Sequence, residues 1–169
     1  MMGWDVNDGN ATDGVLEVVV PSADAMVALG RRLGTCLRAG DVVLLHGDLG
    51  AGKTTFVQGI AHGLGVIASV QSPTFTLVGE HAGVDGTGES LAVHHLDLYR
   101  LTDPDELESF GYDDYLHPDG GISLIEWPER AGDWLPDRFL LVRIEYRDDG
   151  GRTLTFVPVP TGAWVLALS

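Results

Sequence analysis

Apolar residues along this chain form short unbroken runs, and stretches in which they recur every three or four positions. Residues 42–45 are all valine or leucine, the pattern of a strand buried on both faces of a parallel sheet. Farther along, Phe56, Ile60 and Leu64 recur every four residues and predict a helix with one apolar face, which Gly65 ends. These patterns in succession predict a strand, a loop and a helix.

The same patterns divide the rest of the chain into further elements. A strand is predicted at residues 15–20, and Ser22 can cap a helix that follows it to about residue 37. A proline at the first helical position predicts a short helix at residues 103–111. Further strands are predicted at residues 74–78, 91–99, 122–127, 139–146 and 152–157, with glycine-rich residues 82–88 as a hairpin loop. Because hairpin-joined strands run antiparallel, we expect a mixed sheet covered by helices.

Length and composition predict a single domain. The chain has 169 residues, enough to bury a substantial core. Residues 1–14 are rich in Asp, Asn and Gly and are expected to be a flexible lead-in, which leaves residues 15–169 as one domain. The sequence shows no secretory signal, and its single cysteine, Cys36, excludes an internal disulfide. A cytoplasmic location is therefore expected.

The loop after the buried strand carries a phosphate-binding motif. Residues 47–54 fit the pattern G-x-x-x-x-G-K-[ST] at every fixed position, and Lys53 is the only lysine in the chain. Glycines let backbone N–H groups curl round phosphate oxygens, and the following helix adds the positive end of its dipole. The residues of this predicted cradle are Gly47, Asp48, Leu49, Gly50, Ala51, Gly52, Lys53 and Thr54.

The motif also predicts the ligands and the fold class. Lys53 would place a full positive charge over the β- and γ-phosphates, and Thr54 would offer its hydroxyl to Mg²⁺. ATP and Mg²⁺ are the expected ligands. The fold class is therefore α/β, the three-layer fold of P-loop NTPases, with a mixed parallel and antiparallel sheet and helices on both faces.

Two acids stand at the ends of predicted strands, where they could complete the site. The two-residue period of a strand places His95 and Asp97 on one face. Glu126 follows apolar residues 122–125, where an unpaired carboxylate would be costly and a metal ion would relieve that cost. Alternatively, each acid is buried and satisfied by an arginine or by backbone amides. His95 is interpreted as a packing or hydrogen-bonding residue near Asp97, because His94 points to the opposite face and cannot share a zinc ion with it.

Net charge restricts the partners. The chain has 25 acidic and 10 basic residues, a formal net charge of −15. Such a charge repels nucleic acid and anionic membranes at long range. We therefore expect protein partners, no membrane contact and no unaided binding of RNA.

Four segments in order resemble the bacterial TsaE family, small P-loop ATPases of tRNA threonylcarbamoyladenosine biosynthesis. They are residues 47–55, 72–78, 95–100 and 125–129. The resemblance implies that Lys53, Asp97 and Glu126 are catalytic, and that Thr54 and Glu126 hold Mg²⁺, with Asp97 as a further metal-linked acid. It also implies that the nucleotide is contacted by Thr55, by Thr74 in a switch-like segment, by Trp127 and by Arg152.

The same resemblance implies an accessory ATPase, slow in isolation, that acts with TsaB and TsaD while these modify adenosine 37 of tRNA. tRNA would be contacted only indirectly or within that complex. Two other functions stay open: a small-molecule kinase, which would need a second pocket and a mobile arginine-bearing lid, and a module that senses nucleotide without hydrolysing it. A GTPase is disfavoured because its N-K-x-D element requires a second lysine.

Overall fold

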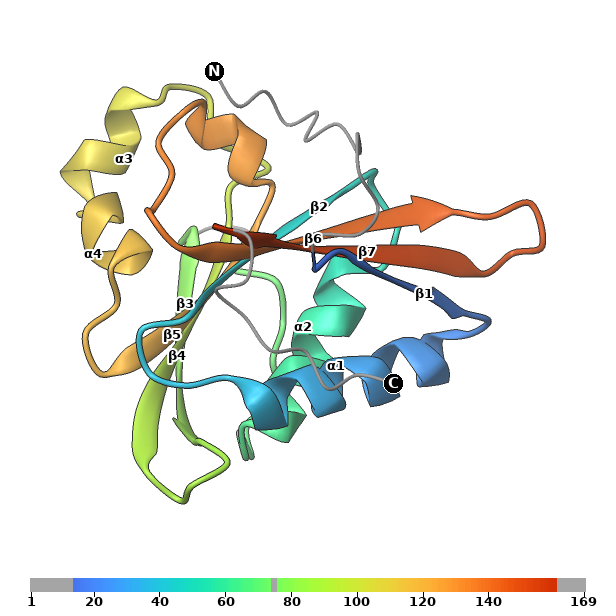
Figure 1. The fold of residues 1–169 in the computed structure, drawn as a ribbon. Helices are drawn as coiled ribbons and strands as arrows, with labels where there is room; N and C mark the ends of the chain where they lie inside the picture. The colour runs from blue at the N-terminus through green and yellow to red at the C-terminus, as the bar shows by residue number, and fades with distance from the viewer. Residues whose placement is uncertain (1–13, 74–75, 161–169) are drawn as a thin grey trace.

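The computed structural model describes residues 14–73 and 76–160, which form one seven-stranded sheet with helices packed against it (Figure 1). The strands are β1 (Leu16–Val20), β2 (Val42–Gly47), β3 (Val78–Val84), β4 (Ser90–Asp97), β5 (Gly121–Glu126), β6 (Phe139–Tyr146) and β7 (Arg152–Val159). The helices are α1 (Ala23–Cys36), α2 (Lys53–Gly63), α3 (Asp105–Ser109), α4 (Tyr112–Leu116) and the 3-10 helix η1 (Pro128–Ala131).

The strand order brings distant parts of the sequence to one edge of the sheet. The order is β1-β7-β6-β2-β5-β4-β3, in which β6, β2, β5 and β4 run parallel, and β1, β7 and β3 are antiparallel to their neighbours. Parallel strands end at the same edge, so the loop after β2 lies beside the ends of β4 and β5. In register, Leu45 of β2 lies opposite Glu126 of β5, and Glu126 lies opposite Asp97 of β4.

Helices cover both faces of the sheet (Figure 1). On one face α1 and α2 bury a core that includes Leu33, Phe56 and Phe156. On the other face α3, α4 and η1 enclose a second core that includes Leu107 and Tyr112. The predicted three-layer α/β fold with a mixed sheet is confirmed.

The helices on the first face begin where the sequence predicts. The Ser22 hydroxyl accepts a hydrogen bond from the amide of Ala25, 3.1 Å away, and caps α1. Helix α2 starts directly after the glycine-rich loop, and its apolar residues Phe56 and Ile60 are fully buried. Helix α1 therefore follows from its cap, and helix α2 from its apolar periodicity.

The strand predicted at residues 74–78 is wrong in its position. Residues 74 and 75 lie outside the described residues. Strand β3 begins only at Val78 and continues to Val84, so it includes residues 82–84, which the sequence analysis placed in a glycine-rich hairpin loop. Its register with β4 runs from Val78 opposite Leu96 to Val84 opposite Ser90. A Cβ on Gly83 would lie 2.8 Å from the Leu64 carbonyl oxygen, so this glycine permits a close backbone approach.

The short helix predicted at residues 103–111 is confirmed as α3, and a second short helix, α4, which the sequence did not predict, follows it. The Asp103 carboxylate accepts a hydrogen bond from the Asp105 amide at 2.9 Å, and α3 begins at Asp105. Gly111, with φ of 75°, interrupts the path and α4 follows it. The break lets Leu107 and Leu116 both reach the core of this face.

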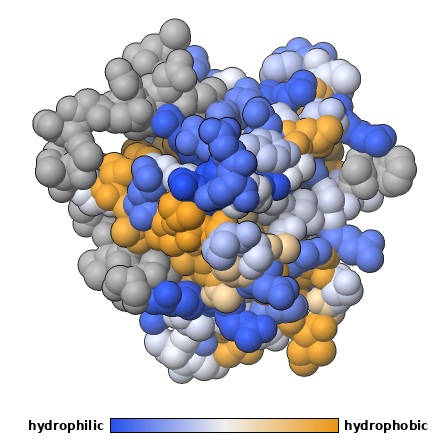
Figure 2. Space-filling model, turned by 90° about the vertical axis from the view of Figure 1, so that its right-hand side faces the viewer, coloured by the Kyte–Doolittle hydropathy of each residue, from blue (hydrophilic) through white to orange (hydrophobic). Residues whose placement is uncertain are grey.

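The surface is mostly polar on the side drawn in Figure 2, the right-hand side of Figure 1, with an apolar patch among the polar residues. Strand β1 lies at that side of the sheet, and its Val19 is 49% exposed. None of the helices in residues 14–73 and 76–160 combines the length and the hydropathy of a membrane-spanning segment.

Candidate functional site

The loop between β2 and α2 has the backbone form that its glycines predict. Gly50 and Gly52 have φ values of 78° and 114°, in the left-handed region that residues with a Cβ rarely adopt. Gly52 stands at the N-cap of α2, and no side chain caps the helix there. The first amides of α2 are therefore available to an anion.

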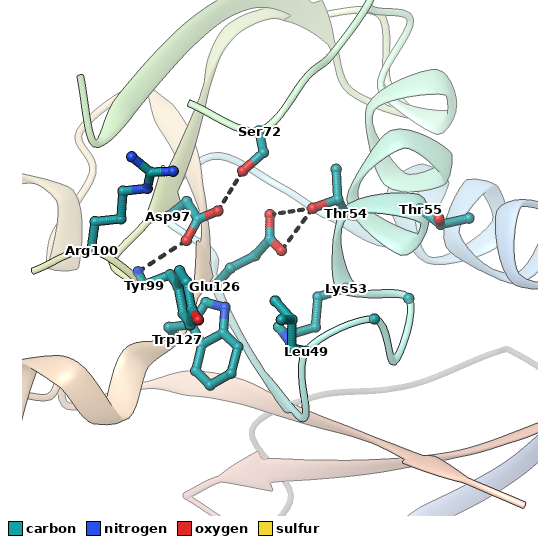
Figure 3. Close-up of a pocket in the computed structure, with 12 residues that line it drawn as sticks. Leu49, Lys53, Thr54, Thr55, Ser72, Asp97, Tyr99, Arg100, Glu126 and Trp127 are labelled. Carbon is teal, nitrogen blue, oxygen red and sulfur yellow. Dashed lines mark hydrogen bonds between the residues drawn. The ribbon is translucent and has the colours of Figure 1, made fainter. Parts of the chain in front are cut away.

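This loop forms one wall of a cavity of about 380 Å³ (Figure 3). The ends of β4 and β5 form the wall opposite it. The lining residues are Leu49, Gly50, Gly52, Lys53, Thr54, Thr55, Ser72, Asp97, Tyr99, Arg100, Glu126 and Trp127. The cavity thus combines five residues of the predicted cradle with both predicted acids, whereas Gly47, Asp48 and Ala51 do not line it.

Lys53 lines the cavity and is held by the loop that precedes it. Only 5% of the residue is exposed, and its Nζ donates hydrogen bonds to the carbonyl oxygens of Gly47, at 2.6 Å, and Asp48, at 2.8 Å. The Trp127 ring centroid lies 4.1 Å from the same Nζ. Burial lowers the pKa of Lys53 below its ordinary value, while Glu126 and other nearby carboxylates oppose that shift. An anion in the cavity would favour the charged form.

Glu126 lies at the centre of a buried hydrogen-bond network. Only 2% of the residue is exposed, and the Thr54 hydroxyl donates to its two carboxylate oxygens at 2.9 and 3.1 Å. On the other side, His95 Nε2 lies 2.5 Å from Glu126 Oε2. His95 thus pairs with Glu126 of the neighbouring strand, whereas the sequence suggested a role beside Asp97. The partners of Glu126 in this network are a hydroxyl and an imidazole, neither an arginine nor a backbone amide.

Asp97 faces the cavity from the end of β4, next to Glu126. It accepts a short hydrogen bond from the Ser72 hydroxyl and another from the Tyr99 amide at 3.0 Å (Figure 3). Asp97 therefore connects the segment before β3 with the segment after β4. No sequence pattern identified Ser72 as its partner, because the contact spans 25 positions.

The oxygen atoms of Thr54, Glu126 and Asp97 fit a magnesium ion. Mg²⁺ prefers oxygen ligands, uses one or two carboxylates and completes its shell with water and substrate phosphates. A hydroxyl already in contact with a buried carboxylate, beside a second acid, supplies that set. Among residues 14–73 and 76–160, no three His, Cys, Asp or Glu side chains cluster as a transition-metal site would require.

The remaining predicted residues lie in three places. Trp127 lies in the main cavity, with φ of 58°, just beyond the end of β5, where the sequence predicted it as a strand residue. Arg152 lies behind the loop and lines a second cavity of about 170 Å³, together with Ala51 and with Gly50, Gly52 and Thr55, which line both cavities. Thr74 lies outside the described residues.

Besides Ser72, the sequence analysis did not identify two residues that line this cavity. Tyr99 and Arg100 lie two and three positions after Asp97, the last residue of β4, so their position just beyond the end of a parallel strand was the available signal. Tyr99 packs against Trp127 with ring centroids 4.9 Å apart, and the Arg130 guanidinium lies 5.5 Å from the Tyr99 ring. These aromatic rings enclose the cavity at the side of Lys53.

Comparison with known proteins identifies the family to which this site belongs. A family model described as "Threonylcarbamoyl adenosine biosynthesis protein TsaE" matches residues 20–154. The chain belongs to the TsaE family. The resemblance proposed from the four sequence segments is thereby confirmed.

Individual members of the TsaE family match this chain over most of its length. It is 42% identical over 135 residues to the tRNA threonylcarbamoyladenosine biosynthesis protein TsaE of Haemophilus influenzae, covering 77% of this chain and 82% of that protein. The protein of the same name from Nostoc is 38% identical over 154 residues, covering 89% and 91%. The crystal structure of Bacillus subtilis YdiB superimposes with a TM-score of 0.71 at 34% identity and covers 86% of both chains. The fold is thus found in an experimental structure of similar sequence.

Proposed function

We propose that this TsaE-family chain binds ATP with Mg²⁺ and hydrolyses it in support of tRNA threonylcarbamoyladenosine biosynthesis. The observation that carries the proposal is the contact of the Thr54 hydroxyl with the buried Glu126 carboxylate, in the cavity that also holds Lys53. A cradle of amides alone would serve any phosphate ligand, whereas a hydroxyl and two acids beside it favour a magnesium-bound nucleotide. The names of the relatives support the pathway.

In this proposal the triphosphate lies along the loop and the N-terminus of α2. Lys53 exchanges its bonds to the Gly47 and Asp48 carbonyls for contacts with the β- and γ-phosphates. Thr54 and Glu126, with Asp97 as a second acid, would hold Mg²⁺, which supplies charge neutralisation at the phosphate oxygens. Because Asp97 is also bonded to Ser72, the segment before β3 can respond to the contents of the cavity.

The nucleoside would extend from the main cavity toward the smaller one behind the loop. The two cavities share Gly50, Gly52 and Thr55, so a ligand can contact both. Trp127 would lie near the phosphates, because its ring already lies over Lys53. Thr74 is proposed to contact the γ-phosphate as part of the switch-like segment.

The proposed partners are TsaB- and TsaD-type proteins, with tRNA contacted only within their complex. A net charge of −15 disfavours unaided binding of tRNA and is compatible with docking on proteins. Hydrolysis in isolation is expected to be slow, because partner contact would be required to order the switch-like segment.

Nucleotide titration and phosphate release, each with and without both partners and tRNA, test this function. Lys53→Ala should weaken ATP binding roughly tenfold to a hundredfold, because it removes a charged hydrogen-bond donor. Glu126→Gln keeps the side-chain shape but loses the charge, so it should still bind nucleotide while hydrolysis slows by about a hundredfold. Glu17→Gln, at an exposed position on β1, is the matched control and should leave both properties unchanged.

The alternatives make different predictions in the same experiment. Tight ATP binding without phosphate release, even with both partners present, would favour a sensing module. Phosphate transferred to an added metabolite would favour a kinase. Repeated tRNA modification at the normal rate by the Glu126→Gln variant would contradict the role given to that acid.

A further inference from the structure

The turn between β6 and β7 approaches the phosphate-binding loop from behind. Tyr146 is the last residue of β6, Arg152 is the first of β7, and they lie directly opposite each other in the sheet register. The Arg152 guanidinium lies 4.3 Å from the centroid of the Tyr146 ring. The two side chains therefore form one unit, about 100 positions away from the loop in sequence.

Each of the two side chains donates a hydrogen bond to a carbonyl of the loop. The Tyr146 hydroxyl donates to the Leu49 carbonyl oxygen at 2.8 Å, and Arg152 Nε donates to the Ala51 carbonyl oxygen at 2.9 Å. Arg152 also donates through a terminal nitrogen to the carbonyls of Gly150 and Gly151, at 2.9 and 3.0 Å. The guanidinium is thus fixed between the turn and the loop.

The geometry of the peptide bond makes these carbonyl contacts relevant to phosphate binding. In a planar trans peptide, the C=O of one residue and the N–H of the next point in opposite directions. Because the Leu49 carbonyl is held toward the hairpin, the Gly50 N–H points away from the hairpin. In the same way, the bond to the Ala51 carbonyl directs the Gly52 N–H away from the hairpin. Both glycines line the main cavity.

Two further observations show that the loop is fitted closely to this support. A Cβ on Gly50 would lie 2.9 Å from the Tyr146 hydroxyl oxygen. Both glycines also have positive φ values. A glycine adopts several other backbone conformations at similar energy, so its sequence alone does not fix this one. External bonds are therefore needed to select the single form that directs both amides toward a ligand.

We propose that Tyr146 and Arg152 are positioning residues that preorganise the Gly50 and Gly52 amides for phosphate, an inference that rests on the proposed function. Arg152 acts on phosphate binding through its bond to the Ala51 carbonyl of the loop. An amide that already points at an oxyanion needs no reorganisation when the ligand arrives, so the contribution of the hairpin appears in affinity.

The test compares two ligands that share phosphates but differ in the nucleoside. ATP and inorganic tripolyphosphate are titrated into the full chain by calorimetry, with melting temperatures measured in parallel. Tyr146→Phe, which keeps the ring, and Arg152→Gln should each weaken both ligands by about threefold to tenfold, the net effect of losing one hydrogen bond to the loop. Arg147→Gln is the matched control, since Arg147 lies on the same turn but bonds Asp149 and Thr153.

Each outcome supports or contradicts the inference. Equal loss for both ligands, at an unchanged melting temperature, supports a role through the loop. Loss for ATP alone in Arg152→Gln would assign Arg152 to the nucleoside, and unchanged affinity in Tyr146→Phe would remove Tyr146 from the site; either result overturns the proposal. If Arg152→Gln does not fold, Tyr146→Phe decides. Failure of the wild-type chain to bind either ligand would instead overturn the proposed function.

Discussion

The two faces of the sheet are packed in different ways. On the face of α1 and α2, the two helices touch through their backbones at four glycines, where any Cβ would clash. An added Cβ would lie 2.6 Å from the Phe56 carbonyl oxygen at Gly30, 2.3 Å from that of Ile60 at Gly34, 2.4 Å from that of Val27 at Gly59 and 2.2 Å from that of Arg31 at Gly63. Such contacts leave little freedom for one helix to slide on the other.

On the opposite face, short helices are held by side chains. Helices α3 and α4 have five residues each, too short to be stable without tertiary contacts. Leu107, Tyr112 and Leu116 fill the core there, and the Tyr112 ring packs edge-on against Trp134 with centroids 5.4 Å apart. Side-chain contacts of this kind can repack where backbone contacts cannot.

The difference shows how the site is divided between the faces. The phosphate-binding loop leads into α2, which belongs to the face with backbone contacts. The acids at the ends of β4 and β5 lead into α3 and η1, which belong to the face held by side chains. The cradle is thus fixed to the more constrained half of the molecule, and the acids and Ser72 are connected to the less constrained one.

The largest effect is expected where the two helix backbones meet. Gly63→Ala would place a Cβ 2.2 Å from the Arg31 carbonyl oxygen and 3.0 Å from the Gly34 Cα, both backbone atoms. Since neither atom can yield without moving a helix, the free energy of unfolding should fall by about 3 kcal/mol or more, the upper end of overpacking costs. For a chain of this length the melting temperature should drop by about 6–12 °C.

Gly79→Ala on β3 is the matched control for this comparison. It makes the same chemical change, but the nearest atom to the new Cβ would be 3.6 Å away, an ordinary contact distance. Its unfolding free energy should stay within about 1 kcal/mol of the wild type. If the two variants have the same melting temperature, the backbone contact between α1 and α2 is not the constraint that we infer.

The sequence predicts the constrained half of the molecule well because its signals are local. The buried run at residues 42–45, the glycine loop and the cap at Ser22 each act within a few positions, and all three are confirmed. The acids could be placed at strand ends because parallel strands end together, and Asp97 and Glu126 do lie side by side.

What the sequence could not predict depends on contacts between distant residues. The extent of β3 is set by its register with β4. The need for glycine at position 83 is set by the close approach of the Leu64 carbonyl oxygen. The His95 ring is hydrogen-bonded to the Glu126 carboxylate, 31 residues away in sequence, and the Tyr146 hydroxyl to the Leu49 carbonyl, 97 residues away. No local pattern carries such pairings, because they exist only once the sheet order is set.

A matched pair of truncations compares the two faces directly. Leu33 on α1 and Leu107 on α3 are both fully buried. Leu33→Ala should cost about 3 kcal/mol or more, because the surrounding backbone contacts prevent the cavity from closing, whereas Leu107→Ala should cost about 2 kcal/mol because a five-residue helix can settle into the space. Chemical denaturation measures the difference, expected at about 1 kcal/mol. Equal losses, or a larger loss for Leu107→Ala, would contradict the contrast between the faces.

The smallest effect is confined to alkaline pH and tests how tightly the second face excludes water. Tyr112 is 1% exposed, and burial raises the pKa of its phenol well above the ordinary value. Above about pH 10 the unfolded chain loses this proton while the folded chain keeps it, so the unfolding free energy should fall by about 1.4 kcal/mol per pH unit.

Tyr112→Phe removes this contribution. The difference in unfolding free energy between the variant and the wild type should therefore be constant between pH 7 and 9 and shift in favour of the variant above pH 10. Urea denaturation across this range measures it, and a difference that stays flat to pH 11 would mean that water reaches the Tyr112 hydroxyl through loosely packed short helices.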